Sequence, residues 1–121
     1  MRIEAAHDTA ILSVASRYAA TPFNVNFADP DGQPLASCLR DILLRAGWSQ
    51  LSAMSPAPGF PRRGVILWAP PTKIHLVNAL AAPLRELFAV QIVERDDGGP
   101  VALTVGLATW ATSRGLLPDS A

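Results

Sequence analysis

The chain has 121 residues, the length of one domain built around a single hydrophobic core. Half of its residues are hydrophobic and 17% are charged, a composition that argues against disorder along the whole chain. Ten basic and ten acidic residues give a formal net charge of zero. A nucleic-acid-binding domain usually carries a basic excess, so we expect no nucleic-acid partner.

The single cysteine and the N-terminal residues bear on where the protein resides. Cys38 has no second thiol with which to form an internal disulfide or a Cys-type zinc site, so a reducing compartment is the simplest interpretation. Glu4, His7 and Asp8 interrupt the apolar stretch that a signal peptide needs. No run of about 18 apolar residues is present, so we expect a cytoplasmic chain that does not itself insert into a membrane.

The first part of the chain predicts a helix, a strand and a second helix. Apolar residues recur every three or four positions over residues 3–18, which is the period of one helix face. Residues 23–28, "FNVNFA", alternate between apolar and polar side chains and predict a strand with one buried face. Turn-forming residues follow at 29–34, and Pro34 suits the first turn of a helix that continues to Ala46.

The end of the second helix carries a specific signal in "LLRAGWSQ", residues 43–50. Gly47 stands where helices commonly take a left-handed residue, and an apolar residue just beyond it often folds back on the last turn. We therefore expect a positive φ at Gly47 and a buried Trp48, which also begins a strand over residues 48–54.

The middle of the chain predicts a loop, a buried strand and a third helix. Three prolines in residues 55–64 predict an exposed loop. Residues 64–69, "GVILWA", form a continuous apolar run that is typical of a strand covered on both faces, and we expect it at the centre of the sheet. Residues 70–88 have a helical period, with Thr72 as the expected cap and a kink or break after Ala82 because of Pro83.

Two further strands are expected over residues 88–94 and 101–107. The segment "RDDGGP" between them contains the Asp-Gly and Gly-Gly steps that favour a hairpin. No period continues beyond Ala108. The sequence thus predicts a single α/β domain with an N-terminal helix over residues 1–109 and a loose C-terminal tail over residues 110–121.

This order of elements contains strand–helix–strand twice. It predicts the α/β (α+β) class, as a two-layer ferredoxin-like or related sandwich with a mixed sheet of about five strands and three helices.

The segments "FNVNFADPDGQPLASCLRDILLRAGW", "GVILWAP", "LVNALAAPLRELFAVQIVE" and "VALTVGL" follow one another in this chain. With its Ala-Gly-Trp helix end, Gly-Val strand and closing Val-Gly strand, the succession resembles a small soluble α/β domain of uncharacterised bacterial proteins, over about residues 10–107. In such proteins the domain is often appended to transmembrane helices. The resemblance implies an interaction or sensing role and a full-length protein that carries membrane helices, and it brings no catalytic motif.

Candidate ligand-binding residues lie near the ends of the first and third expected strands: Asp29, Asp31, Thr72, Lys73 and His75. The two aspartates follow a strand end where open α/β sheets bind ligands, although turn formation is their ordinary role. "PPTK", residues 70–73, begins a helix whose free N–H groups, with a hydroxyl and a cation, suit an anion. Ordinary capping is the better explanation, because no glycine-rich loop is present to let a phosphate approach the backbone. His75 and His7 have no partners at metal-ligand spacings, so we expect no metal site, and we expect no cofactor.

Two functions are consistent with these observations. The first is a non-enzymatic module for interaction, sensing or oligomerisation, since no serine or cysteine is accompanied by the signature of an activated nucleophile. The second is a small enzyme or nucleotide- or anion-binding protein, in which the five candidate residues would meet in one concave cleft.

A protein partner or a homodimer is expected because a half-apolar chain of zero net charge leaves some hydrophobic surface outside its core. The expected contact surfaces are the free edge of the strand over residues 101–107, Trp110 with Leu107, and the front helix with Ile3 and Ile11.

Overall fold

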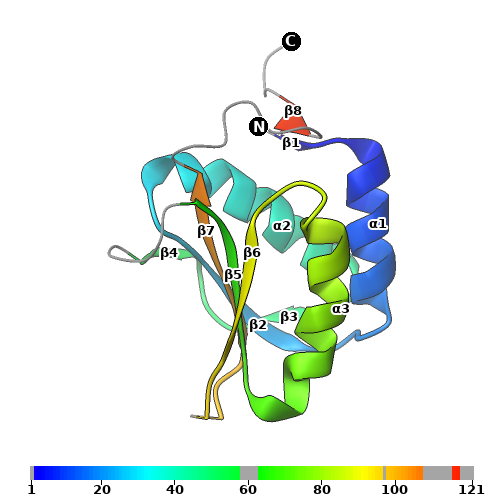
Figure 1. The fold of residues 1–121 in the computed structure, drawn as a ribbon, viewed down its shortest axis with the longest axis vertical. Coiled ribbons are helices and arrows are strands. Elements are labelled where there is room, and N and C mark those ends of the chain that lie inside the picture. The colour runs from blue at the N-terminus through cyan, green and yellow to red at the C-terminus, as the bar shows by residue number, and fades with distance from the viewer. Residues whose placement is uncertain (1, 58–62, 97, 108–115, 118–121) are drawn as a thin grey trace.

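A computed structural model of the chain describes every residue except 1, 58–62, 97, 108–115 and 118–121 (Figure 1). The described helices are α1 (Ala5–Ser16), α2 (Gln33–Arg45) and α3 (Ile74–Leu84), with short 3₁₀ turns η1 (Pro30–Gly32) and η2 (Pro71–Lys73) before the second and third. The described strands are β1 (Arg2–Ile3), β2 (Pro22–Phe27), β3 (Ser49–Gln50), β4 (Ser55–Pro56), β5 (Arg63–Ala69), β6 (Val90–Glu94), β7 (Val101–Leu107) and β8 (Leu116–Leu117).

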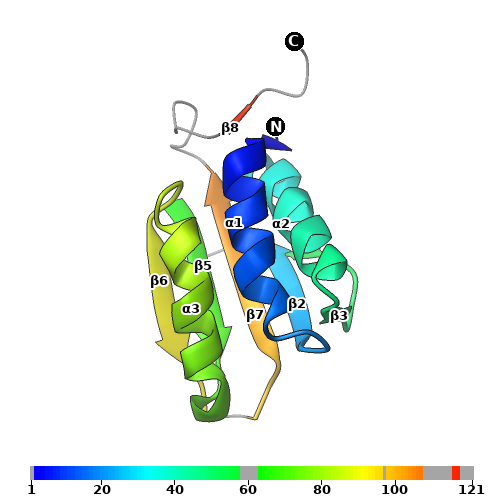
Figure 2. The ribbon, with the colours of Figure 1, turned by 90° about the vertical axis from the view of Figure 1, so that its right-hand side faces the viewer.

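The elements form two layers, and all three helices lie on one face of the main sheet (Figure 2). This six-stranded sheet has the order β3-β2-β7-β5-β6, with β4 also paired to β2. Strands β2, β3, β4 and β7 are parallel, and β5 and β6 run the opposite way. The predicted α/β class, with three helices and a mixed sheet, is confirmed. Each strand–helix–strand unit keeps its parallel strands adjacent, so the related sandwich forms rather than the split arrangement of the ferredoxin-like fold.

The helices cover the sheet in a way that leaves the core between the layers. α2 contacts β2 and β7, α3 contacts β5 and β6, and α1 lies against both α2 and α3 (Figure 2). β2 shows the expected alternation: Phe23 and Val25 are buried in this core, whereas Asn24 and Asn26 accept hydrogen bonds from serine hydroxyls on the other side of the strand.

The end of α2 confirms the signal in its sequence. Gly47 has a φ of +91°, and its N–H donates to the Leu44 carbonyl at 3.1 Å. The Trp48 N–H donates to the Leu43 carbonyl at 3.0 Å, which completes the paired hydrogen bonds of a Schellman motif. Trp48 is only 3% exposed, so the predicted burial of this side chain is also confirmed.

Replacing Gly47 with Val should lower the free energy of unfolding by more than about 1 kcal/mol, because a branched side chain is poorly tolerated at this φ. A Cβ at this position would also lie 3.3 Å from the Cβ of Ala19. Urea denaturation measures the loss, and Gly47→Asn, which tolerates the left-handed region, should lose less. An unchanged melting temperature for Gly47→Val would contradict the capping role.

The strand expected over residues 48–54 is largely wrong. β3 comprises Ser49–Gln50 only, and the chain returns to β2 at β4, Ser55–Pro56. Trp48 is the single fully buried side chain of the segment, and of its later residues only Met54 packs against the core. The loop expected over residues 55–64 is exposed at Ser55 and Pro56, and most of the rest lies outside the described residues.

The strand order also corrects the second half of the prediction. β7, not β5, occupies the middle of the order, and β5 separates β6 from β7, so the expected hairpin is wrong. Val101, Ala102 and Leu103, on alternate faces of β7, are all buried, as is typical of an inner strand. Both of its edges are paired, one with β2 and one with β5, so it has no free edge with which to meet a second copy.

Of the other expected contact surfaces, the structure tests only the front helix. Ile3 and Ile11 belong to the core and leave no apolar surface of their own on the front helix. Trp110 lies outside the described residues. Of the expected tail over residues 110–121, the structure describes Leu116–Leu117, which pair with β1 as a separate two-stranded sheet.

The third helix starts and ends differently from the prediction. Thr72 lies within η2 and provides no side-chain cap, and Lys73 occupies the N-cap position of α3. The helix does not break after Ala82 but continues through Pro83 and ends at Leu84, so the proline falls in the last turn, where it disturbs little of the helix. Leu84 and Leu87 face the core, as expected.

Candidate functional site

The directions of the strands separate the five candidate residues into two groups. β2 is parallel to β7, and β7 is antiparallel to β5. The C-terminal ends of β2 and β5 therefore lie at opposite ends of the sheet, as measured along the strands. Asp29 and Asp31 follow β2 at one end of the sheet, whereas Thr72, Lys73 and His75 follow β5 at the opposite end. The structure therefore does not form the single cleft that the enzyme hypothesis requires.

Asp29 has the turn-forming role. Its carboxylate accepts a hydrogen bond from the Gly32 N–H at 2.7 Å and caps η1, the 3₁₀ turn that leads into α2. Asp31 lies within the same turn, and its side chain lies outside the described part of the structure. The capping hydrogen bond makes Asp29 part of the scaffold.

Thr72 and Lys73 line a hollow of about 400 Å³, which we call the Lys73 hollow. Four chain segments meet there: the start of β2, the segment after β3, the turn η2 and the connection into β7. Its walls are mainly apolar and are formed by Pro22, Leu51, Pro70, Thr72, Lys73, Gly98, Gly99, Pro100 and Val101. Among these lining residues, Lys73 carries the only formal charge.

Arg95 fixes one wall of the Lys73 hollow. Its guanidinium donates a hydrogen bond to the Pro100 carbonyl and lies 5.9 Å from the centroid of the Trp68 ring. The Trp68 indole N–H in turn donates to the Thr104 hydroxyl at 3.0 Å. This chain of contacts ties the connection between β6 and β7 to the sheet.

The two histidines join α1 to α3 instead of forming a site. His75 is exposed, and its ring meets the Tyr18 ring edge-on with the centroids 5.8 Å apart. At the other end of the same pair of helices, Nδ1 of His7 lies 3.6 Å from a carboxylate oxygen of Glu86. His75 is not among the residues that line the Lys73 hollow.

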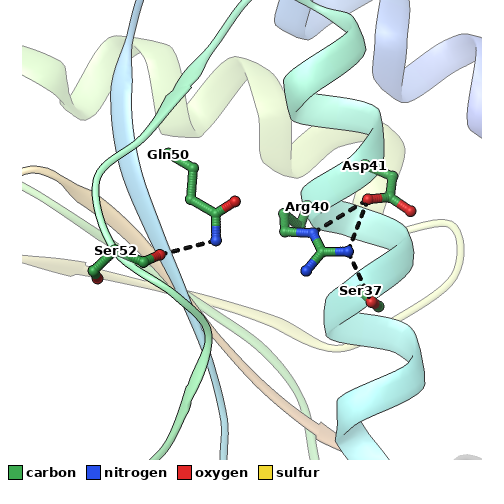
Figure 3. A network of polar contacts seen from close by, with 5 residues as sticks. All are labelled: Ser37, Arg40, Asp41, Gln50 and Ser52. Carbon is green, nitrogen blue, oxygen red and sulfur yellow. Dashed lines mark hydrogen bonds and ion pairs between the residues drawn. The ribbon is translucent and has the colours of Figure 1, made fainter.

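A second, more polar hollow lies between α2 and the segment after β3 (Figure 3). Its volume is about 480 Å³, and it is lined by Arg40, Gln50, Leu51, Ser52, Ala53 and Met54. The Arg40 guanidinium donates to Asp41 at 3.1 and 3.2 Å and to the Ser37 hydroxyl at 3.2 Å (Figure 3). Because its charge is already paired with a neighbouring carboxylate, Arg40 is less suited than Lys73 to attract an anion.

Cys38 does not have the character of an activated nucleophile. The side chain is partly buried in α2, and burial raises the pKa of its thiol. The protonated thiol therefore predominates at neutral pH, whereas a reactive cysteine needs a lowered pKa. No group of three or more His, Cys, Asp or Glu side chains in the described residues is arranged to hold a metal ion.

Sequence analysis identified Thr72 and Lys73 but missed the other walls of the hollow. Pro22, Leu51 and the 98–101 segment are distant from one another in sequence, and none of them was predicted to belong to a site. These segments come together only because of the strand order, which no local sequence pattern predicts.

Comparisons with known proteins add no identification. No family model, curated protein or solved structure matches the chain. No helix among the described residues is long and apolar enough to cross a membrane.

Proposed function

We propose that this chain is a non-enzymatic sensing or interaction module whose Lys73 hollow binds a small ligand with an anionic group and an apolar body. The observation that carries the proposal is the convergence of four chain segments on one hollow with apolar walls and a single cation. Sites for small molecules are typically concave, mostly apolar and equipped with a few polar groups that fix orientation.

The size and charge of the hollow define the ligand class. A volume of about 400 Å³ falls near the lower end of the range for small-molecule sites. Lys73 favours a carboxylate or phosphate in the hollow, because its ammonium group is the only formal charge among the lining residues. Leu51, which is 57% exposed, and the three prolines favour an apolar body for the ligand.

The lining residues favour binding over catalysis. Within the described structure they supply one hydroxyl and one amine, but no carboxylate, imidazole or thiol that would act as a general base beside them. The alternative of a small enzyme is therefore the weaker proposal.

The wider setting follows from the resemblance to appended bacterial domains. We propose a cytoplasmic module, carried in its full-length form by a membrane-anchored bacterial protein that binds a protein partner. The sequence of the complete gene product tests this part directly, because transmembrane helices should flank the module.

Hexanoate and phenyl phosphate should raise the melting temperature of the chain in a concentration-dependent way, and neutral hexanol should raise it much less. Replacing Lys73 with Met should weaken the binding of both anions at least about tenfold, since it removes the charge while retaining the length of the side chain. Arg85→Met is the matched control, because Arg85 is an exposed cation at the other end of α3. Absence of any shift at millimolar ligand, or an equal shift in Lys73→Met, would contradict the proposal.

A further inference from the structure

The two edge strands of the main sheet differ in how well they are protected against pairing with a further strand. At one edge, β3 and β4 are two residues long each, and β4 contains Pro56. At the other edge, β6 is five residues long and pairs with β5 without a bulge from Val90 to Glu94. Figure 2 shows β6 as the outermost strand, beyond α3, and no described strand pairs with its outer side.

β6 lacks the usual devices that prevent edge-to-edge pairing. Its sequence, "VQIVE", contains no proline and no lysine, and its single charge is Glu94 at the end. Natural proteins generally protect an edge strand with short length, bulges, proline or charge. An unprotected edge of this length is a ready template for another strand.

The hydrogen bonds to β5 identify the backbone groups that face outward. The Val65 N–H donates to the Ala89 carbonyl at 2.9 Å, and the Arg95 N–H donates to the Ala69 carbonyl at 2.8 Å. Neighbouring residues of a strand direct their backbone groups to opposite sides. The N–H and C=O groups of the alternate residues between these two bonds therefore face away from β5: Val90, Ile92 and Glu94.

We propose that β6 pairs antiparallel with β6 of a second copy of this chain, around a twofold axis at Ile92. In this register Ile92 faces Ile92 of the second copy, and Val90 faces Glu94 in both directions. These are three pairs in which every outward N–H meets an outward C=O. A register shift of two residues either way, the smallest shift that again places outward groups opposite one another, leaves one outward residue of each strand without a partner within β6.

The charges of the chain are consistent with a second copy as the partner of β6. Antiparallel pairing places each Glu94 opposite an apolar Val90, and four residues of strand, about 13 Å, separate the two Glu94 positions along the strand direction. A formal net charge of zero supplies no long-range repulsion between copies. The contact uses the same surface on both chains and closes after two copies, as a twofold interface does. This inference is independent of the Lys73 hollow.

Light scattering after size exclusion, from micromolar to millimolar chain, tests the association. The mass should rise from 12.8 kDa to twice that value. Glu94→Pro should raise the dissociation constant at least about tenfold, because it removes an outward N–H at both ends of the interface. Glu94→Ala retains that N–H and should change the constant less than about threefold. A constant mass of one chain, or a dimer unaffected by Glu94→Pro, would overturn the inference.

Disulfide cross-linking tests the register separately and does not depend on how well the proline variant folds. In a Cys38→Ser background, Ile92→Cys should link two copies under mild oxidation, because the Cα atoms of a hydrogen-bonded antiparallel pair lie about 5.5 Å apart. Glu94→Cys should not link, since the two positions are too far apart. Links at both positions, or a link at Glu94→Cys alone, would rule out the register centred on Ile92.

Discussion

Replacing Gly64 with Ala should destabilise the protein by at least about 3 kcal/mol, the largest effect that we expect from adding a single methyl group. Gly64 is the second residue of β5 and has a φ of +68°, which costs an L-residue about 1–2 kcal/mol. A Cβ there would also overlap the carbonyl oxygen of Ala89 and lie 3.0 Å from its carbonyl carbon. Both are backbone atoms, so relief requires β5 to move away from the segment before β6. Urea denaturation followed by circular dichroism measures the loss.

Gly98 provides the matched control for this variant. Its φ of +70° is nearly the same as that of Gly64, but no atom lies within 4 Å of a Cβ built at this position. Gly98→Ala should therefore cost only the backbone term, about 1–2 kcal/mol. Equal losses for the two variants would show that the close approach to Ala89 is not what requires glycine in β5.

Replacing Trp48 with Ala should cost about 3–5 kcal/mol, the range for removing a large aromatic side chain from a core. The Trp48 indole donates a hydrogen bond to the Ala15 carbonyl at 2.9 Å, and its ring meets Phe23 edge-on with the centroids 5.8 Å apart. The side chain thus joins the end of α2 to both α1 and β2. Its removal leaves a cavity and takes one hydrogen bond from the Ala15 carbonyl, which still accepts from the Tyr18 N–H at 3.0 Å. Equilibrium urea denaturation measures the combined cost.

Two further variants separate the cost of the lost hydrogen bond from the cost of the lost aromatic ring. Trp48→Phe retains most of the ring and loses the N–H donor, so it should cost about 0.5–1.5 kcal/mol for the lost hydrogen bond to the Ala15 carbonyl. Leu44→Ala, on the same helix but with Leu44 42% exposed, should cost less than either variant. If Trp48→Ala cost no more than Leu44→Ala, the joining role of the indole would be wrong.

The candidate site could be found from the sequence only in part. Thr72 and Lys73 were identified because they stand between a strand and a helix, and a helix start has a local signature. Asp29 was grouped with them because it also follows a strand. Since β5 runs opposite to β2, however, Asp29 lies at the other end of the strands from Thr72 and Lys73. Whether the C-terminal ends of two strands lie at the same end of the sheet depends on the relative directions of the strands. No local sequence pattern predicts these directions.

The sequence by itself determined the elements that local chemistry specifies. The alternation in β2, the helical period of α2, and Gly47 with Trp48 at its end were all interpreted correctly, since side-chain spacing and the left-handed preference of glycine act within a few residues. Only the tertiary structure decided that β7 lies between β2 and β5. An apolar strand can pair equally well with several neighbours, and "RDDGGP" allows a hairpin as readily as a connection that passes the end of β5. The choice depends on the whole sheet, because β5 and β7 both carry buried residues on both faces and neither apolar pattern ranks one strand above the other. That choice leaves β6 at the edge and assembles the Lys73 hollow.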